Sequence, residues 1–408
     1  MVNTISRGGT FFGVSKSLWR DPRTWLMLLA ITEKNIFRYL MLVLTMATGM
    51  EGVGDLVLHT SYILLIGLCL AKGSKFRSGD IFIMFFVVMA ILLTWIIYPD
   101  NIERYMFGKG QFWPVVFPLF RYFIVGLFLI PNDETVSLMG KVSCLAIFVE
   151  SLFVYFILRG SDLQSNDDMS RAYFILLNVL LVINYAFDKK LFWGIVFSVV
   201  GILFITSMGT RGPVIITLAF IACKIVQAAI GKGLGNIAVV AIFLLIWFVN
   251  SDLWNAFLLW MKGIIEALGL STRVIDLSIQ DEALTYMSER DEIADIVINK
   301  IKERPLTGWG VYGEWQFNGW SAHNMYLELL DHYGVILGGV IILWILFINI
   351  KAFLVSKARP VRGLVMLFAC FCLVRGIFGG GFLTFPTFLM IGYCLQVCRK
   401  TNFKYIGN

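Results

Sequence analysis

A series of long apolar runs constrains this chain more than any other feature of its sequence. A helix that crosses a bilayer needs about 20 mostly apolar residues, and reading the chain for such windows gives about twelve of them. Polar and apolar residues do not alternate along these runs, so a transmembrane barrel is not indicated. The runs lie near residues 36–50, 53–71, 81–98, 113–130, 139–158, 171–187, 191–208, 212–230, 235–250, 334–355, 361–378 and 381–398. They predict an all-α polytopic membrane protein with about 12 transmembrane helices.

Composition agrees with a surface that faces lipid. Hydrophobic residues make up 58% of the 408 residues and charged residues only 15%, whereas an ordinary soluble domain carries roughly a quarter charged residues. These values exclude a cytosolic globular enzyme and a disordered chain. Residues 1–23 lack the apolar core and the small-residue cleavage site of a secretory signal peptide, so we expect none.

The positions of the basic residues predict the orientation of the chain. With the N-terminus in the cytoplasm and about twelve crossings, the cytoplasmic segments hold far more Lys and Arg than the external loops. Examples are Lys72, Arg77, Lys189, Lys190 and Arg399. This asymmetry follows the positive-inside rule and puts both termini in the cytoplasm. The formal net charge of +7 is then explained by topology, and no nucleic-acid partner is indicated.

One long segment interrupts the apolar pattern and divides the chain into three parts. Residues 251–333 separate an N-terminal membrane bundle, residues 1–250, from the C-terminal membrane helices, residues 334–408. In the predicted orientation this segment faces outward. Its residues 289–303 carry apolar side chains at helical spacing, which predicts an amphipathic helix, and Pro305 is expected to end it.

The external segment is also rich in tryptophan. Such residues suit either a belt at the membrane surface or platforms on which sugar rings stack. We consider Trp309 and Trp320 candidates for contact with a substrate, and the full set is Trp254, Trp260, Trp309, Trp315 and Trp320.

Disulfides and metal ligands are not indicated by the sequence. All seven cysteines fall within the predicted spans, where they suit small residues of a membrane core. No group of Cys, His or carboxylate residues has the spacing of a zinc site. We therefore expect no metal and no cofactor.

A few polar residues need a functional explanation. His323 lies in the external loop beside Asn324, and imidazole exchanges a proton readily near neutral pH, so His323 is the best candidate for a general base. Arg121 lies inside the fourth window and Arg375 near the outer end of the eleventh. Charges buried in a bilayer usually face a cavity or a partner, which makes both arginines candidates for binding an anionic substrate.

Two further arginines are expected on the external side. Arg211 stands between the seventh and eighth windows, and Arg290 opens the predicted amphipathic helix. Arginine binds phosphate through paired hydrogen bonds. The chain carries no Walker loop or dinucleotide fingerprint. An enzyme that acts outside the cell has no nucleotide available, so the pattern favours a substrate that arrives activated as a lipid-linked pyrophosphate.

Three segments resemble the bacterial O-antigen ligase and O-antigen polymerase superfamily, which are integral membrane glycosyltransferases of the GT-C class. MGTRGPVIITL is similar to the Ser/Thr-Arg-Gly segment that opens a span in this family. SERDEIADIVINKIKERPLTGWGVYGEW is similar to its Arg-bearing amphipathic helix followed by Pro-Leu-x-Gly-x-Gly, and AHNMYLELLDHYGVILG to its His-Asn-x-Tyr-Leu-Glu segment. Together these segments span residues 195–339, and the first half of the chain resembles the family only in hydropathy.

The resemblance implies roles for residues at the matching positions. Arg211 and Arg290 would bind the pyrophosphate of an undecaprenyl-pyrophosphate-linked glycan donor, and His323 would act as base on the acceptor hydroxyl, without a metal. The acceptor site would be shaped by Asn324, Tyr326 and Glu328. The resemblance also implies a GT-C-like fold in the bacterial inner membrane, with the active site facing the periplasm or cell exterior and short helices in the long extracytoplasmic loop.

Several functions remain open at this point. A polymerase, which we favour, joins lipid-linked repeat units of O-antigen, capsule or a related polysaccharide, and a chain-length regulator is then a candidate partner. An O-antigen ligase transfers the glycan to a lipid A-core acceptor instead. A lipid-linked oligosaccharide flippase is a further alternative, although the two halves of the chain show no internal repeat. A membrane acyltransferase would need a cytosolic donor, whereas His323 is expected outside.

Overall fold

The computed structural model describes most of the chain, and its regular structure is helical throughout the described part. The described residues are 15–50, 52–103, 112–153, 166–189, 192–208, 211–230, 252–267, 272, 275–276, 279, 290–318, 321–379 and 381–400. This confirms the predicted all-α class. The helices are α1 Lys16–Trp19, α2 Pro22–Thr32, the π-helix η2 Glu33–Phe37, α3 Arg38–Thr48, α4 Val53–Ala71, α5 Ser78–Ile97, α6 Pro99–Ile102, α7 Phe112–Phe128, α8 Asp133–Phe153, α9 Asn166–Lys189, α10 Phe192–Ser207, α11 Arg211–Ile230, α13 Asp252–Ala267, α15 Arg290–Glu303, α16 Glu314–Asn318, α17 Met325–Val355, α18 Arg359–Ala369, the π-helix η5 Cys370–Val374, α19 Arg375–Phe378 and α20 Phe385–Lys400.

Six helices of the described chain are long and apolar enough to cross a membrane. They are Val53–Ala71, Ser78–Ile97, Asp133–Phe153, Arg171–Asp188, Met325–Val355 and Arg359–Ile377, and three shorter apolar helices are Val116–Phe128, Phe192–Ser207 and Gly212–Ala228. Each of these helices overlaps a predicted window. Large apolar side chains on them stay exposed, such as Phe82 and Ile96 on α5, which are 66% and 78% exposed. These features indicate a multi-pass membrane protein whose outer surface suits lipid.

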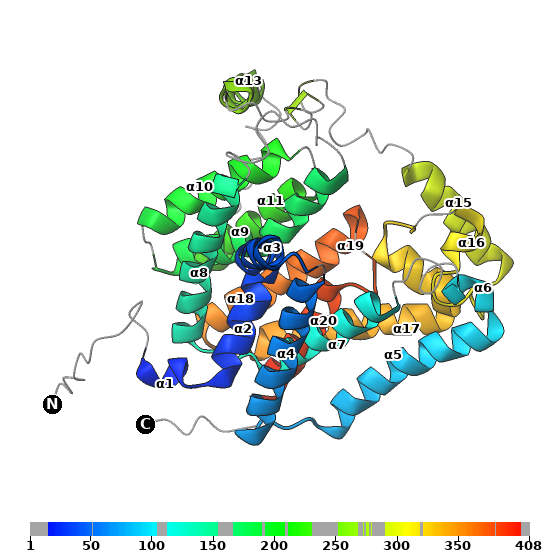
Figure 1. Ribbon diagram of the computed structural model, residues 1–408. Coiled ribbons are helices and arrows are strands. Elements are labelled where there is room, and N and C mark those ends of the chain that lie inside the picture. The colour runs from blue at the N-terminus through cyan, green and yellow to red at the C-terminus, as the bar shows by residue number, and fades with distance from the viewer. Residues whose placement is uncertain are drawn as a thin grey trace.

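The start of the first predicted window differs from the structure. The chain is already helical from Pro22, and the π-helical segment η2 joins α2 to α3. Lys34 and Arg38, which stand at the edge of the predicted window 36–50, therefore lie within a continuous helical stretch. In Figure 1, α3 is seen nearly end-on whereas α2 runs along the picture, so the stretch changes direction at η2. The window at 235–250 lies outside the described residues, and the window at 381–398 corresponds to α20.

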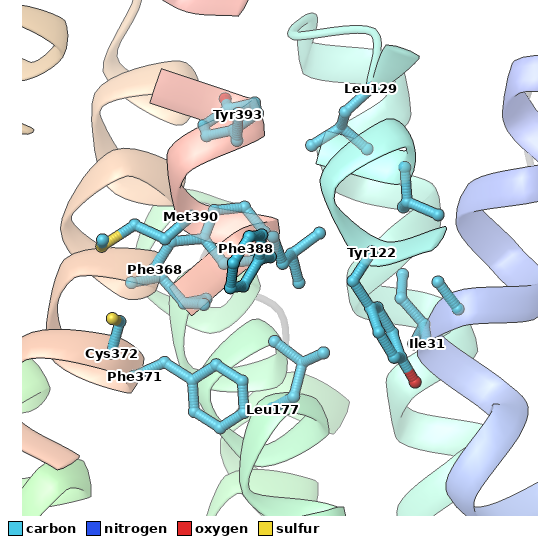
Figure 2. Close-up of a cluster of buried hydrophobic side chains, with 14 of the residues drawn as sticks. Ile31, Tyr122, Leu129, Leu177, Phe368, Phe371, Cys372, Phe388, Met390 and Tyr393 are labelled. Atoms are coloured by element: carbon cyan, nitrogen blue, oxygen red, sulfur yellow. The ribbon is translucent and has the colours of Figure 1, made fainter. Parts of the chain in front are cut away.

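The bundle is held together by close packing of α7 and α20. A Cβ on Gly126 of α7 would lie 2.4 Å from the carbonyl oxygen of Leu389, and one on Gly392 of α20 would lie 2.3 Å from that of Phe123. Small residues permit this backbone approach, which stabilises helix pairs where lipid removes the hydrophobic driving force. Figure 2 shows the apolar side chains beside this contact, including Phe388 and Tyr393 of α20 and Tyr122 of α7.

Helix α5 connects two opposite faces of the molecule. Near its start, Asp80 accepts a hydrogen bond from Nη1 of Arg399 at 2.9 Å, so the last turn of α20 lies there. At its other end, the Tyr98 hydroxyl lies 2.9 Å from Nη1 of Arg304, which follows α15. The loop after α15 and the C-terminal end of α20 are thus a full span apart. The predicted topology, in which the loop and the C-terminus lie on opposite sides of a membrane, stays a prediction.

Candidate functional site

The predicted amphipathic helix is confirmed as α15. It covers Arg290–Glu303, and Pro305 follows it as expected. Val297 and Ile301 on its apolar face are buried against Ala322, which immediately precedes His323. The apolar face of α15 therefore supports the turn that carries the predicted base.

Another amphipathic helix, α13, lies at the start of residues 251–333, the segment predicted to be external. Leu258, Met261 and Ile265 on one face are buried together with Ile275, while Trp260 is 61% exposed. A helix with one apolar face inside and an exposed tryptophan suits the membrane surface, as the belt interpretation of the tryptophans expects. A hydrogen bond from the Lys262 ammonium, at 2.7 Å, lowers the pKa of Asp276 beside this helix.

The segment after α15 is bound to α17 through its backbone. The Trp309 N–H donates to the carbonyl oxygen of Asp331 at 2.7 Å, and the Val335 N–H donates to that of Pro305 at 2.7 Å. These bonds flank Gly334, whose φ of 74° and ψ of 169° break α17 into two parts. Residues 325–333 form the first part, and the long apolar part follows the break.

The glycines of this region are required by that pairing. Gly308 has a φ of +66°, and a Cβ on it would lie 2.4 Å from the carbonyl oxygen of Asp331. A Cβ on Gly334 would lie 2.4 Å from the carbonyl oxygen of Leu306. Both positions combine a left-handed backbone with a close approach, which only glycine tolerates without strain. The Pro-Leu-x-Gly pattern and the glycine at the later helix break are thus two halves of one contact.

His323 lies in a strained turn at the start of α17. Its φ is 51°, a left-handed value that is uncommon for a residue with a side chain. Its N–H donates to the Ser321 hydroxyl at 3.2 Å. Next to it, Asn324 caps α17, since its side-chain oxygen accepts from the N–H groups of Tyr326 and Leu327 at 3.0 and 3.1 Å. Strain of this kind persists where surrounding contacts enforce it and is frequent at functional sites.

Glu328 fixes this turn to the loop before α20. One of its carboxylate oxygens accepts from the Ser321 hydroxyl at 2.7 Å, and the other accepts from the Phe382 N–H at 2.7 Å. The side chain is buried, with 5% of the residue exposed. Both oxygens are therefore occupied by donors of the protein, and Glu328 positions the His323 turn.

Arg375 connects the turn to the start of α11. Its guanidinium lies 4.6 Å from the ring centre of Tyr173 on α9. A Cβ on Gly212, the second residue of α11, would lie 2.1 Å from the Tyr173 hydroxyl, so Tyr173 also contacts the start of that helix.

The short helix α19, which begins at Arg375, also lies against the start of α17. A Cβ on Gly376 would be 3.1 Å from the side chain of Met325. The Tyr326 hydroxyl donates to the carbonyl oxygen of Leu373 at 3.1 Å. Figure 1 shows α19 between the start of α17 and the pair of α9 and α11. Three predicted site residues, His323, Tyr326 and Arg375, thus lie in one region of the structure.

Other predicted residues are described only in part. Arg211 is the first residue of α11 and Arg290 the first residue of α15, but their side chains lie outside the described part of the structure, as does Trp320. The ring of Trp309 packs within the loop: its Nε1 donates to the carbonyl oxygen of Lys300 at 2.9 Å, and the Arg304 guanidinium lies 3.9 Å from its ring centre.

Arg121, on α7, lies away from this region, and its guanidinium contacts η2 and α4. Its guanidinium is 2.7 Å from a carboxylate oxygen of Glu33, and both side chains are almost fully buried. The Tyr62 and Tyr122 hydroxyls donate to the same carboxylate at 2.8 and 2.7 Å. The charge of Arg121 is therefore balanced by Glu33, a partner that the sequence could not reveal because the two residues lie on separate helices.

A cavity that the sequence did not predict lies beside this ion pair. It has a volume of about 370 Å³ and combines basic and aromatic side chains, among them Lys34, Arg38, Arg171, Phe153 and Phe174. Lys34 and Arg38 lie 5.6 and 5.9 Å from the ring centre of Phe174. Arg171 and Phe174 flank Tyr173 in the sequence, so the cavity and the Arg375 contact share one segment of α9. Only folding brings together its lining residues, which come from η2, α3, α4, α8 and α9.

A second unexpected feature is a buried cluster of Glu314, Asp331 and His332, where one ligand atom from each side chain lies within 4.8 Å of the others. The expectation of no metal was based on the spacing of residues along the chain. That spacing does not reveal this cluster, because Glu314 lies at the start of α16 and the other two residues lie on α17. It is the group of side chains in the described structure that could hold a metal ion.

Comparison of the chain with protein-family models, with curated proteins and with solved structures finds no match in any of the three. Fold and site together define a helical, multi-pass membrane protein with a polar site at one end of the bundle. Its function is therefore inferred from the residues themselves.

Proposed function

We propose that this protein is a membrane glycosyltransferase that polymerises oligosaccharide repeat units linked to undecaprenyl pyrophosphate on the extracytoplasmic face. The observation that carries the proposal is the meeting of α11, α19 and the start of α17. Tyr173 contacts both the start of α11, the helix that begins with Arg211, and the Arg375 guanidinium. Gly376, next to Arg375, contacts Met325, which follows the His323 turn. A base and an anion-binding region are needed side by side for transfer of a sugar from a pyrophosphate.

The proposed reaction uses these groups in separate roles. His323 takes the proton of the acceptor hydroxyl as its oxygen bonds to the anomeric carbon of the donor. The bond from that carbon to the pyrophosphate oxygen breaks, and undecaprenyl pyrophosphate leaves with the electron pair. Arg211, in the role that the resemblance implies, acts with Arg375 and the N-terminus of α11 to stabilise the developing negative charge, because guanidinium groups and free backbone N–H groups both favour phosphate.

An apolar groove near the site suits the lipid part of the donor. It has a volume of about 480 Å³ and lies between α5, α17 and α20, with Phe82, Phe86, Leu337, Trp344, Phe382 and Phe388 in its lining. Phe382 also donates its N–H to Glu328, so the groove reaches the residue that positions the His323 turn. An isoprenoid chain in this groove would keep its pyrophosphate end near the polar site.

The proposal is tested with the purified protein in detergent and lipid-linked repeat units. We expect His323→Asn to lower kcat by about 10²–10⁴-fold, the usual contribution of a general base. Asparagine is the matched replacement because it tolerates a left-handed backbone, so the turn keeps its shape. Glu303→Gln, at an exposed position of α15, is the control. Turnover like that of the unchanged protein in both His323→Asn and Arg211→Ala would refute the assignment.

The same assay separates the polymerase from the alternatives. Longer glycan formed from lipid-linked repeat units alone supports a polymerase. A strict need for lipid A-core would identify a ligase. Movement of the lipid-linked glycan across vesicles without any new glycosidic bond would identify a flippase.

A further inference from the structure

Three buried side chains with metal-binding atoms meet beside the glycine segment, residues 304–313, whose backbone pairs with α17. Glu314 and Asp331 are fully buried and His332 is 2% exposed. Glu314 begins α16, while Asp331 and His332 stand just before the break of α17 at Gly334. A carboxylate oxygen of each acid and a ring nitrogen of His332 lie within 4.8 Å of one another.

Several of these atoms have no hydrogen-bond partner among the described residues. They include Oε1 of Glu314 and Nδ1 of His332, and no side chain of the described residues donates to the Asp331 carboxylate, which faces the backbone N–H of Glu314. A buried charged or polar group without a partner is costly, so such groups are normally paired or bound to a metal. The two oxygens of nearby Glu328 already accept from Ser321 and Phe382, so Glu328 does not belong to the unmatched set.

Protons alone do not satisfy this arrangement. Nε2 of His332 lies 2.9 Å from Oε2 of Glu314 and 3.0 Å from the backbone nitrogen of Tyr312. If Nε2 carries a proton, it donates to the Glu314 carboxylate, but the Tyr312 N–H then points at another N–H group. If Nε2 carries no proton, it accepts from the Tyr312 N–H, but it then faces Oε2 of Glu314, which is also an acceptor. Neither choice gives a side-chain donor to the Asp331 carboxylate.

We propose that Glu314, Asp331 and His332 bind one divalent transition-metal ion. Zn²⁺ takes carboxylate oxygen and imidazole nitrogen at about 2.0–2.2 Å, so two such ligands lie at most roughly 4.4 Å apart. The observed group, within 4.8 Å, reaches this range after a shift of a few tenths of an ångström. The imidazole favours Zn²⁺ over the oxygen-seeking Mg²⁺ and Ca²⁺, and the two carboxylates also suit Mn²⁺.

The ion clamps the loop onto the helix that carries the site. It joins Glu314, which follows the glycine segment, to Asp331, whose backbone accepts from Trp309. Asp331 lies in the same helical stretch as Glu328, which positions the His323 turn. The ion therefore has a structural role, separate from the proposed reaction, and its presence is measured without any glycan substrate.

The test uses the full protein in detergent. The protein is treated with a chelator, dialysed, and incubated with Zn²⁺ or Mn²⁺; bound metal is then measured by elemental mass spectrometry and thermal unfolding is recorded. We expect one equivalent of bound ion and a higher unfolding temperature for the loaded protein. Asp331→Asn and His332→Gln should lose the bound metal and the temperature shift, whereas the control Glu303→Gln should keep both.

Two results would overturn the inference. The first is a wild-type protein that binds neither ion and unfolds at the same temperature with and without chelator. This measurement does not depend on whether any variant folds. The second is an Asp331→Asn variant that still binds one equivalent, because the metal would then lie elsewhere. A wild-type protein that binds the metal but makes no glycan would contradict the proposed function without contradicting the metal site.

Discussion

Two adjacent glycines in α17, Gly338 and Gly339, test whether the close contact across the break in this helix fixes the position of the site. A Cβ on Gly338 would lie 2.3 Å from the carbonyl oxygen of Leu329, which belongs to the helical part before the break. At Gly339 a Cβ would meet nothing within 4 Å. The same substitution, glycine to alanine, therefore falls on a tight contact at one position and on open space at the next.

The magnitude follows from that contact. An ordinary van der Waals contact begins at 3.4 Å, so Gly338→Ala must separate the two parts of α17 by 3.4 minus 2.3, or 1.1 Å. Forcing extra volume into a packed contact costs about 1–3 kcal/mol of stability. Gly339→Ala should be neutral or stabilise the protein by up to about 1 kcal/mol, because alanine is the better helix former.

The separation should also affect activity, because Leu329 is next to Glu328. Moving that part of the helix weakens the hydrogen bonds from Ser321 and Phe382 that hold the His323 turn. Thermal unfolding in detergent and turnover of lipid-linked repeat units measure the two effects. Equal stability and equal turnover for Gly338→Ala and Gly339→Ala would show that the close approach across the break does not hold the site.

Two further predictions concern buried ion pairs. Arg121→Met should destabilise the protein by up to about 3 kcal/mol in denaturant unfolding, because the buried Glu33 then keeps only the partly exposed Lys34, 3.2 Å away, and the double variant with Glu33→Gln should recover most of the loss. If the double variant is stable but inactive, Arg121 has a direct role with substrate; if it is active, the pair is structural. Lys224→Met should also destabilise the protein, since the fully buried ammonium lies 3.0 Å from Asp188. This loss is limited in the same way, because Arg359 also lies 3.4 Å from Asp188, and unfolding of Lys224→Met at the same temperature as the wild-type protein would contradict the prediction.

Local patterns in the sequence were enough for much of the fold. The apolar windows identify α4, α5, the helices from α7 to α11, the part of α17 after the break at Gly334 and the helices from α18 to α20, since a span must be apolar over its whole length. The spacing of Val297 and Ile301 and the position of Pro305 predict α15 within one residue of its observed limits. In each case neighbouring residues carry the whole signal. The late start predicted for the first span has the same origin: Lys34 and Arg38 look like a boundary unless their partners on other helices are known.

The candidate site could be predicted only in part. His323, Asn324 and Glu328 lie close together in the chain, so their proximity follows from sequence. The contact of Arg375 with Tyr173, which links them to the start of α11, joins residues about 200 positions apart. No periodicity encodes such a pairing.

What the sequence by itself determined is a helical membrane protein with one polar segment, because hydropathy is a property of each residue and its neighbours. Tertiary structure decided which charges are balanced and which are not. Arg121 became half of an ion pair when α7 packed on η2, and Glu314 met Asp331 and His332 when the glycine segment paired with α17. The physical reason is that the cost of a buried charge depends on what lies within a few ångströms of it, and only the packing of distant segments sets those distances.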